Sequence, residues 1–138
     1  MNFSTLILLK PDVPRRKLIG KIIERIENLG LSIIAMNMLE PKGSLIEDHY
    51  ESLKDKKFFS ELCEYIGSGP VIAIVVKGED AIKIMRKAAG STDPLEASPG
   101  TIRGDFATGI SRNIIHTSDS AESAEREIQI WFPGKFSF

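Results

Sequence analysis

Hydrophobic residues change their spacing several times along the first half of the chain. Residues 3–9 are apolar and rich in β-forming side chains, which predicts a buried strand. Residues 14–30 place apolar side chains at helical spacing with charged ones between them, which predicts an amphipathic helix. A second strand is predicted at 31–39. The segment 44–67 is helical in composition, and we expect two short helices there with a break near residues 55–57.

The second half begins with the continuous apolar run 71–76, which indicates a central strand. Residues 79–89 predict a helix, residues 113–116 a short strand, and residues 119–131 a final helix capped at its first residue. The stretch 90–111 is rich in glycine, proline and threonine and has no clear period. Long irregular segments in compact domains are usually functional or disordered.

The resulting order is strand, helix, strand, helical pair, strand, helix, strand, helix. This order fits an α+β fold, an α/β sandwich in which a ferredoxin-like split βαβ arrangement gives a four-stranded antiparallel sheet covered by helices. The chain has 138 residues, the usual length of one domain, so we expect residues 1–138 to form a single domain.

Composition and charge narrow the function classes. Eighteen basic and nineteen acidic side chains leave a net charge of −1, which argues against nucleic acid as the main partner. Cys63 is the single cysteine, which excludes an internal disulfide and a cysteine-based zinc site. The longest apolar run has six residues, against the ~20 of a membrane helix, and no basic segment marks a signal peptide. We therefore expect a soluble protein of the cytoplasm with no membrane partner.

Candidate chemistry concentrates in residues 99–128. Arg103 and Arg112 lie among glycines and small residues, where backbone can approach a ligand closely, and the arginine side chain suits phosphate groups. His116 ends a strand just before a helix N-terminus, so it can meet a phosphoryl group or serve as a structural histidine. The arginines can equally form a solvated face.

Other side chains have plain structural interpretations. Lys10 can extend from a strand end to solvent, and Glu127 belongs to a run of helix charges that pair at i,i+4 spacing. Phe58 is either core packing or an exposed platform for stacking. We interpret Cys63 as a small buried hydrophobe. We interpret His49 as a core histidine, because nothing cationic or nucleophilic is patterned around it.

The segment 113–127, with the sequence NIIHTSDSAESAERE, closely resembles the signature of nucleoside diphosphate kinases. The other segments that match the family, in its own order, are 10–12, 54–59, 68–70 and 99–106. The resemblance extends over residues 5–132. It implies transfer of the terminal phosphoryl group of a nucleoside triphosphate, usually ATP, to a nucleoside diphosphate. The family does this in two half-reactions through phosphohistidine, which maintains the NTP and dNTP pools.

The resemblance also implies roles for individual residues. His116 matches the nucleophile, and Glu127 matches the residue that fixes the tautomer of its ring. Tyr50 and Ser118 match residues that support the histidine, and Lys10 belongs to the same catalytic group.

Further matching positions imply how a nucleotide is bound. The residues that match the family's nucleotide contacts are Lys10, Phe58, Arg86, Thr92, Arg103, Ile110 and Asn113. Phe58 and Ile110 are implied to sandwich the base, which suits any base because every base has a π-face. The others are implied to contact the ribose 3′-hydroxyl and the phosphates. Mg²⁺ is implied as a cofactor carried by the nucleotide phosphates, with no protein metal site.

Family members are hexamers or tetramers built from a shared dimer, so the resemblance implies a homo-oligomer. The alternative to an enzyme is a non-catalytic nucleotide-binding regulatory module of the same fold. Retention of both His116 and Glu127 favours the enzyme, because a binding module has no need of a nucleophile with its orienting carboxylate.

Three positions depart from the family pattern. Val13-Pro14 stands in place of Gly-Val, Lys57 in place of a proline, and Thr117 in place of the glycine that follows the nucleophile. A β-branched residue would be strained at positive φ. We predict negative φ for Thr117, because it continues the extended segment 114–116.

Overall fold

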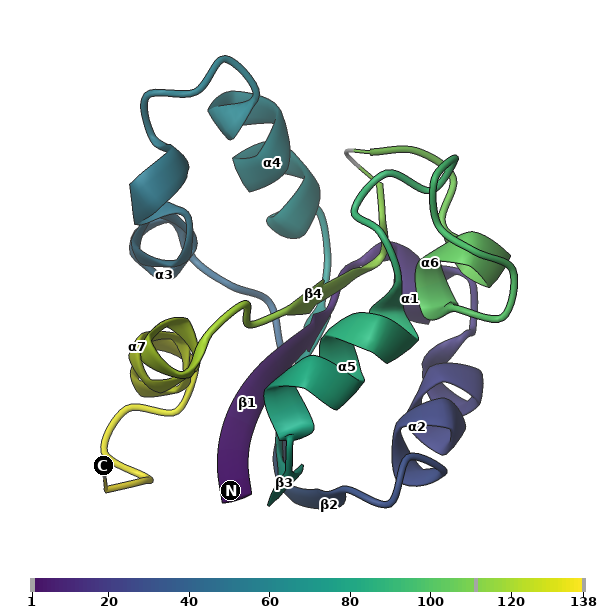
Figure 1. Cartoon of the computed structure of the whole chain (residues 1–138). Helices are drawn as coiled ribbons and strands as arrows, with labels where there is room; N and C mark the ends of the chain where they lie inside the picture. The colour runs from purple at the N-terminus through teal and green to yellow at the C-terminus, as the bar shows by residue number, and fades with distance from the viewer. Residues whose placement is uncertain (1, 111, 138) are drawn as a thin grey trace.

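Four strands form one antiparallel sheet in the computed structural model, which describes residues 2–110 and 112–137. The strands are β1 (Asn2–Leu9), β2 (Ser32–Leu39), β3 (Val71–Glu79) and β4 (Ile115–Thr117). Their order in the sheet is β2-β3-β1-β4, so β3 and β1 lie at the centre (Figure 1). The predicted ferredoxin-like α+β fold is confirmed.

Helices cover both faces of this sheet. They are α1 (Asp12–Arg15), α2 (Ile19–Glu27), α3 (Gly43–His49), the 3₁₀ turn η1 (Glu51–Leu53), α4 (Phe59–Ile66), α5 (Ala81–Ala89), α6 (Ile102–Phe106) and α7 (Ala121–Trp131). Residues of α2 and α5 form a core on one face, and residues of α3, α4 and α7 form a core on the other (Figure 1). Among the described residues, no helix is long and apolar enough to cross a membrane.

Burial on both faces explains the continuous apolar runs in the sequence. Successive strand side chains point to opposite faces, so Leu6 and Leu8 of β1 enter the core under α7, while Ile7 and Leu9 enter the core under α2 and α5. A strand covered on both sides loses the polar alternation of a half-exposed strand. The predicted central strand at 71–76 is therefore present, and it extends to Glu79.

Several predicted boundaries were wrong. The helix expected over residues 14–30 is two helices, because Lys17 adopts φ 59° and turns the chain between them. The helix expected from residue 79 starts at Ala81, since Glu79 is still paired in β3 and Asp80 turns the chain at φ 56°. The cap of the last helix is Ser120, whose side chain accepts a hydrogen bond from Ser123 N, rather than Asp119.

The irregular stretch predicted at 90–111 is largely confirmed. It contains one short helix, α6, whose cap is the Thr101 hydroxyl. Ser111, the last residue of the predicted stretch, lies outside the described residues. The break predicted near residues 55–57 is also confirmed, because the chain between η1 and α4 is not helical.

Thr117 has the backbone conformation that we predicted. It lies in β4, pairs with Ile7 and is buried. Among the described residues, the non-glycine residues with positive φ are Lys17, Asp80 and Ile114, so the strain expected of a glycine site is absent at Thr117.

We expect Thr117→Gly to lower the free energy of unfolding by at least roughly 0.5–1 kcal/mol, because glycine loses more backbone entropy in a strand and leaves the packing of the threonine unfilled. A thermal melt measures the loss, and kcat should change little. A rise in both the melting temperature and kcat would contradict this prediction.

Candidate active site

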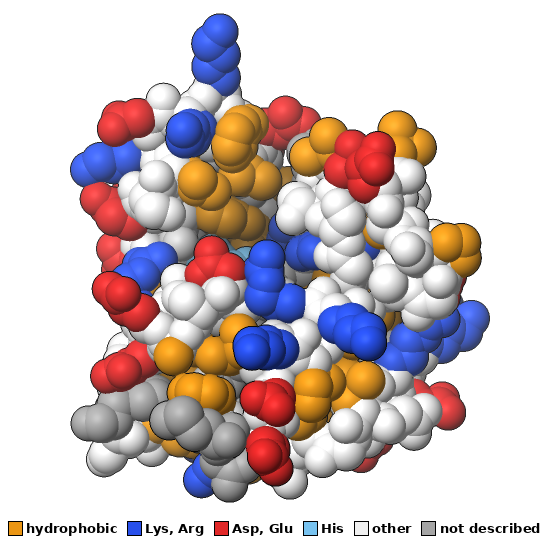
Figure 2. Space-filling view, viewed as in Figure 1, with side chains coloured by type: hydrophobic (Ala, Val, Ile, Leu, Met, Phe, Trp, Pro, Cys, Tyr) orange, Lys and Arg blue, Asp and Glu red, His pale blue; other side chains and the backbone are white. Residues whose placement is uncertain are grey.

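A cleft opens between the α3–α4 side of the molecule, the loop after α5 and the strand β4. Its volume is about 380 Å³. Figure 2 shows this hollow, with hydrophobic side chains on the α4 side and Lys and Arg side chains below it. The predicted site residues that line it are Lys10, Tyr50, Phe58, Arg86, Thr92, Arg103, Ile110, Asn113, His116 and Glu127. Segments far apart in the sequence therefore bring almost the whole predicted site together, and Ser118 lies just behind it.

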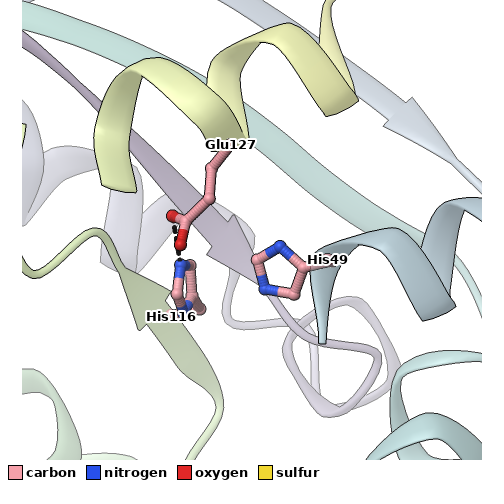
Figure 3. A group of neighbouring side chains, drawn as sticks. All are labelled: His49, His116 and Glu127. Carbon is pink, nitrogen blue, oxygen red and sulfur yellow. Dashed lines mark hydrogen bonds and ion pairs between the residues drawn. The ribbon is translucent and has the colours of Figure 1, made fainter. Parts of the chain in front are cut away.

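His116, Glu127 and Ser118 form a hydrogen-bonded group at the base of the cleft. Nε2 of His116 lies 2.7 Å from Glu127 Oε1 (Figure 3). The Ser118 hydroxyl donates to the same oxygen at 2.7 Å. Glu127 is 6% exposed and Ser118 is fully buried. A carboxylate accepts hydrogen bonds, so Nε2 carries the proton. In the neutral ring Nδ1 is then the nitrogen with a lone pair for a ligand.

A tight turn before β4 sets the direction of this strand. Ile115 N donates to Asn113 O at 2.8 Å, which closes a γ-turn around Ile114. Ile114 has φ 63°, a conformation that strains a β-branched residue by about 1–3 kcal/mol. Lys10 N donates to Ile114 O at 2.8 Å, and the Ile114 side chain is fully buried, so tertiary packing holds the turn.

Lys10 and Asn113 are paired beside the nucleophile. Lys10 follows β1 and is 5% exposed, and its Nζ donates to Asn113 Oδ1 at 2.7 Å. Burial, together with the nearby positive charge of Arg103, lowers the pKa of Lys10 from 10.5 to about 7. Among the described residues no carboxylate pairs with Lys10, and a phosphate group in the cleft would supply an anionic partner.

Arg103 is built into the wall of the cleft. Its two terminal nitrogens donate to the carbonyl oxygens of Gly90 and Ile115, each at 2.7 Å. Its Nε is buried and has no partner among the described residues. Burial and the charge of Arg86 lower the pKa of Arg103 to about 10. Arg86, on the adjacent helix α5, is exposed at the cleft.

Apolar side chains also line the cleft. Phe58 is 47% exposed and Ile110 is 61% exposed, which leaves both free to contact a flat ligand. Leu53 and Leu62 line the cleft as well, and our sequence analysis did not name them. In the sequence, nothing beyond the helical composition of residues 44–67 distinguishes these two leucines as cleft residues.

Tyr50 is among the residues that line the cleft, although its side chain is only 7% exposed. Its hydroxyl oxygen is buried and has no hydrogen-bond partner among the described residues. Burial raises the pKa of this hydroxyl, so it stays protonated.

One of our two expectations for His49 was wrong. It is buried at 4% exposure, as expected of a core histidine. The expectation that nothing cationic or nucleophilic surrounds it was wrong, because its ring centroid lies 4.5 Å from that of His116. Nδ1 of His49 accepts a hydrogen bond from Trp131 Nε1 at 3.1 Å. Burial and the nearby His116, Lys10 and Arg126 lower the pKa of His49 well below its usual value.

His49, His116 and Glu127 also form the one group of metal-ligating side chains found among the described residues, with ligand atoms within 4.8 Å of one another. The bond from Trp131 keeps the proton of His49 on Nε2, which cannot then coordinate an ion. Two imidazoles and one carboxylate are also a poor match for Mg²⁺, which prefers oxygen ligands.

Comparison with known proteins identifies relatives over nearly the full length. The sequence profile of the family described as nucleoside diphosphate kinase matches residues 4–136. A nucleoside diphosphate kinase from Methanocaldococcus jannaschii is 53% identical over 132 residues, which are 96% of this chain and 94% of that protein. One from Mycobacterium tuberculosis is 52% identical over 135 residues, which are 97% of this chain and 99% of that protein.

Solved structures show the same similarity. A nucleoside diphosphate kinase from Encephalitozoon cuniculi superposes with a TM-score of 0.95 at 44% identity, covering 99% of this chain and 92% of that one. One from Aquifex aeolicus gives a TM-score of 0.94 at 41% identity, with 97% of each chain covered.

Proposed function

Because the chain belongs to the nucleoside diphosphate kinase family and is a phosphotransferase with that activity, we propose that it acts through a phosphohistidine on His116. The observation that carries this proposal is the 2.7 Å contact of His116 Nε2 with Glu127 at the base of a cleft lined by cationic side chains. This contact leaves Nδ1 with the free lone pair that a nucleophile needs.

In the first half-reaction, Nδ1 attacks the terminal phosphorus of the donor triphosphate. The N–P bond forms while the bond from phosphorus to the bridging oxygen breaks, and the diphosphate leaves with that electron pair. In the second half-reaction, a terminal phosphate oxygen of the acceptor diphosphate attacks the same phosphorus, and the N–P electron pair returns to the ring. Nε2 keeps its proton throughout, and Glu127 stabilises the positive charge that the ring carries while Nδ1 is bonded to phosphorus.

The cations of the cleft serve the phosphates in this proposal. Lys10, Arg86 and Arg103 stabilise the charge on the phosphoryl oxygens, and Thr92 and Asn113 contact the phosphates and the ribose 3′-hydroxyl. Mg²⁺ is the proposed cofactor, bound on the nucleotide phosphates, where it would neutralise part of their charge. Glu127 and Asp119 are the carboxylates of the described lining, and Glu127 is already engaged with His116 and Ser118.

We expect Arg86→Ala and Arg103→Ala each to lower kcat/KM by ~10²–10³-fold, the usual effect of losing one donor to a charged transition state. The two variants should differ in stability. Arg103→Ala leaves two carbonyl oxygens unpaired, at about 1–3 kcal/mol each, whereas Arg86 is exposed and its loss should leave the melting temperature unchanged. A coupled assay and a thermal melt measure both effects. A fall in kcat/KM of less than roughly threefold would exclude that arginine from the side chains that stabilise the phosphoryl oxygens.

We propose that Phe58 and Ile110 hold the base between them. Both are exposed apolar side chains on the cleft, which supports a stacking role without reading of base edges.

Phe58→Ala should therefore raise KM for every nucleotide alike, by roughly 5- to 150-fold, since stacking on one aromatic ring contributes ~1–3 kcal/mol. Steady-state assays with purine and pyrimidine diphosphates measure this, and Lys57→Ala, at an exposed neighbouring position, is the control. A selective loss for purines or for pyrimidines would replace the sandwich with recognition of base edges.

We propose that the protein assembles as a homo-oligomer, a hexamer or a tetramer built from dimers. Strand β2 lies at an edge of the described sheet and exposes Ile34, Met36 and Met38 at 39%, 55% and 54%. An apolar edge strand favours pairing with another chain, which supports a dimer through this edge. We place the 138-residue domain in the cytoplasm, with the nucleotide pools that it would maintain.

The alternative, a non-catalytic regulatory module, would bind nucleotides without being phosphorylated. Incubation with γ-labelled ATP and Mg²⁺ separates the two functions. The enzyme should become labelled, with a phosphate that is labile in acid and stable in base, because an N–P bond behaves in this way and a serine phosphate does not. A protein that binds ATP and stays unlabelled would support the regulatory module.

A further inference from the structure

His49 contacts the nucleophile without lining the cleft. It is the last residue of α3, and the planes of its ring and the His116 ring meet at 83°. In Figure 3 the edge of the His49 ring points at the face of the His116 ring, while Glu127 meets His116 from another side. The ring of His116 is therefore bounded both by its hydrogen bond to Glu127 and by His49.

One helix fixes both of these contacts. Arg126 of α7 donates to the backbone carbonyls of Asp48 at 3.0 Å and His49 at 3.3 Å, which ties the end of α3 to α7. Trp131 of α7 donates to the His49 ring, and Glu127, between them on the same helix, accepts from His116. The placement of the His49 ring is thus coupled to the placement of the carboxylate that orients the nucleophile.

The hydrogen bond from Trp131 also determines which nitrogen of the His49 ring carries the proton. An indole N–H can only donate, so Nδ1 of His49 must accept and Nε2 carries the proton. A protonated His49 would lose this bond. Burial, together with the nearby His116, Lys10 and Arg126, lowers the pKa of His49 well below its usual value. The ring that packs against His116 is neutral, and an edge-to-face contact of neutral rings is favourable.

We infer that His49 is a positioning residue for His116. Its ring edge prevents the His116 ring from turning about its bond to Cβ, which holds Nε2 on Glu127 and Nδ1 toward the phosphate. A histidine ring that turns freely spends part of its time with neither nitrogen aligned, and small misplacements of a reacting atom lower rates strongly. This inference rests on the proposed phosphohistidine chemistry at His116.

Two substitutions separate the ring contact from the hydrogen bond. His49→Asn places an amide oxygen near the position of Nδ1, so it keeps an acceptor for Trp131 and removes the ring. His49→Phe keeps a ring against His116 and leaves the Trp131 N–H unpaired. For each variant we would measure the single-turnover rate of labelling by γ-labelled ATP, the Kd for ADP and the melting temperature.

If His49 positions His116, His49→Asn slows labelling by about 10–100-fold with an unchanged Kd, although it is the more stable variant. His49→Phe slows labelling by at most about threefold, although it is the less stable one. Rates that follow stability, with His49→Asn near wild type and His49→Phe slow, would overturn the inference, as would two variants that both label at the wild-type rate.

If His49→Phe fails to fold, Trp131→Phe takes its place, since it removes the donor and leaves the His49 ring against His116. It should label within about threefold of wild type, and a larger loss overturns the inference. A wild-type protein that is not labelled at all would instead contradict the proposed function, so the two failures are distinguishable.

Discussion

Replacement of His116 by alanine is expected to abolish both labelling by γ-labelled ATP and phosphoryl transfer to a diphosphate. Nδ1 of His116 is the nucleophile of the proposed mechanism, and a covalent route with no nucleophile falls by at least about 10⁴-fold. The cationic and apolar side chains of the cleft remain in the variant, so the Kd for ADP should change little. Labelling followed by acid and base treatment, with calorimetric titration of ADP, measures both expectations.

The contact of His49 with His116 makes one control necessary. His49 is the other histidine of the chain and lies in the same site, so a residual label in His116→Ala must be tested for transfer to it. Its Nδ1 is engaged by Trp131 and its Nε2 carries a proton, which predicts that it does not take the phosphoryl group. Labelling of His116→Ala at the wild-type level would contradict the assignment of the nucleophile.

The fold was predictable because its elements have strong periodicity. Residues 6–9 of β1 and 71–76 of β3 are apolar without interruption, since helices cover both faces of the sheet. The helical spacing of α2 follows from its one buried face. The boundaries were less predictable. Lys17 and Asp80 turn the chain at positive φ. Lysine has no preference for this conformation, so the turn at Lys17 could not be predicted from its side chain.

The site was predictable through its motifs, whereas its internal contacts were not. Ile114 shows the reason most clearly, since isoleucine is among the residues least suited to φ 63° and only the surrounding packing holds it there. Arg103 was predicted as a phosphate contact, but its bonds to the Gly90 and Ile115 carbonyls depend on two other segments. The contact between His49 and His116 similarly joins α3 to β4, and local sequence carries no signal of it.

Lys10→Met should produce an enzyme that is more stable and far less active. The side chain is 5% exposed, and its ammonium group lies near Asn113 and Arg103 with no carboxylate partner in the described part of the chain. Methionine fills a similar volume with no charge to bury, which should raise the melting temperature at pH 7 even though it leaves Asn113 Oδ1 without its donor, at about 1–3 kcal/mol. Loss of one charged donor to the phosphates should lower kcat/KM by ~10²–10³-fold.

The stability difference between Lys10→Met and wild type should depend on pH in a defined direction. Folding lowers the pKa of Lys10 from 10.5 to about 7, so between these values the unfolded chain binds more protons than the folded one. The free energy of unfolding of the wild type therefore rises with pH across this window, and the buried charge destabilises the folded state most below pH 7. Urea unfolding at several pH values should show that Lys10→Met exceeds wild type in free energy of unfolding most near pH 6–7, with a difference that shrinks toward pH 10.

The control is Lys21→Met, at an exposed position, which should show no such trend. Two results would contradict the proposal that the buried charge of Lys10 destabilises the fold and serves to bind the phosphates. One is a Lys10→Met protein that is less stable than wild type at pH 7, and the other is a stability difference between the two proteins that grows with pH.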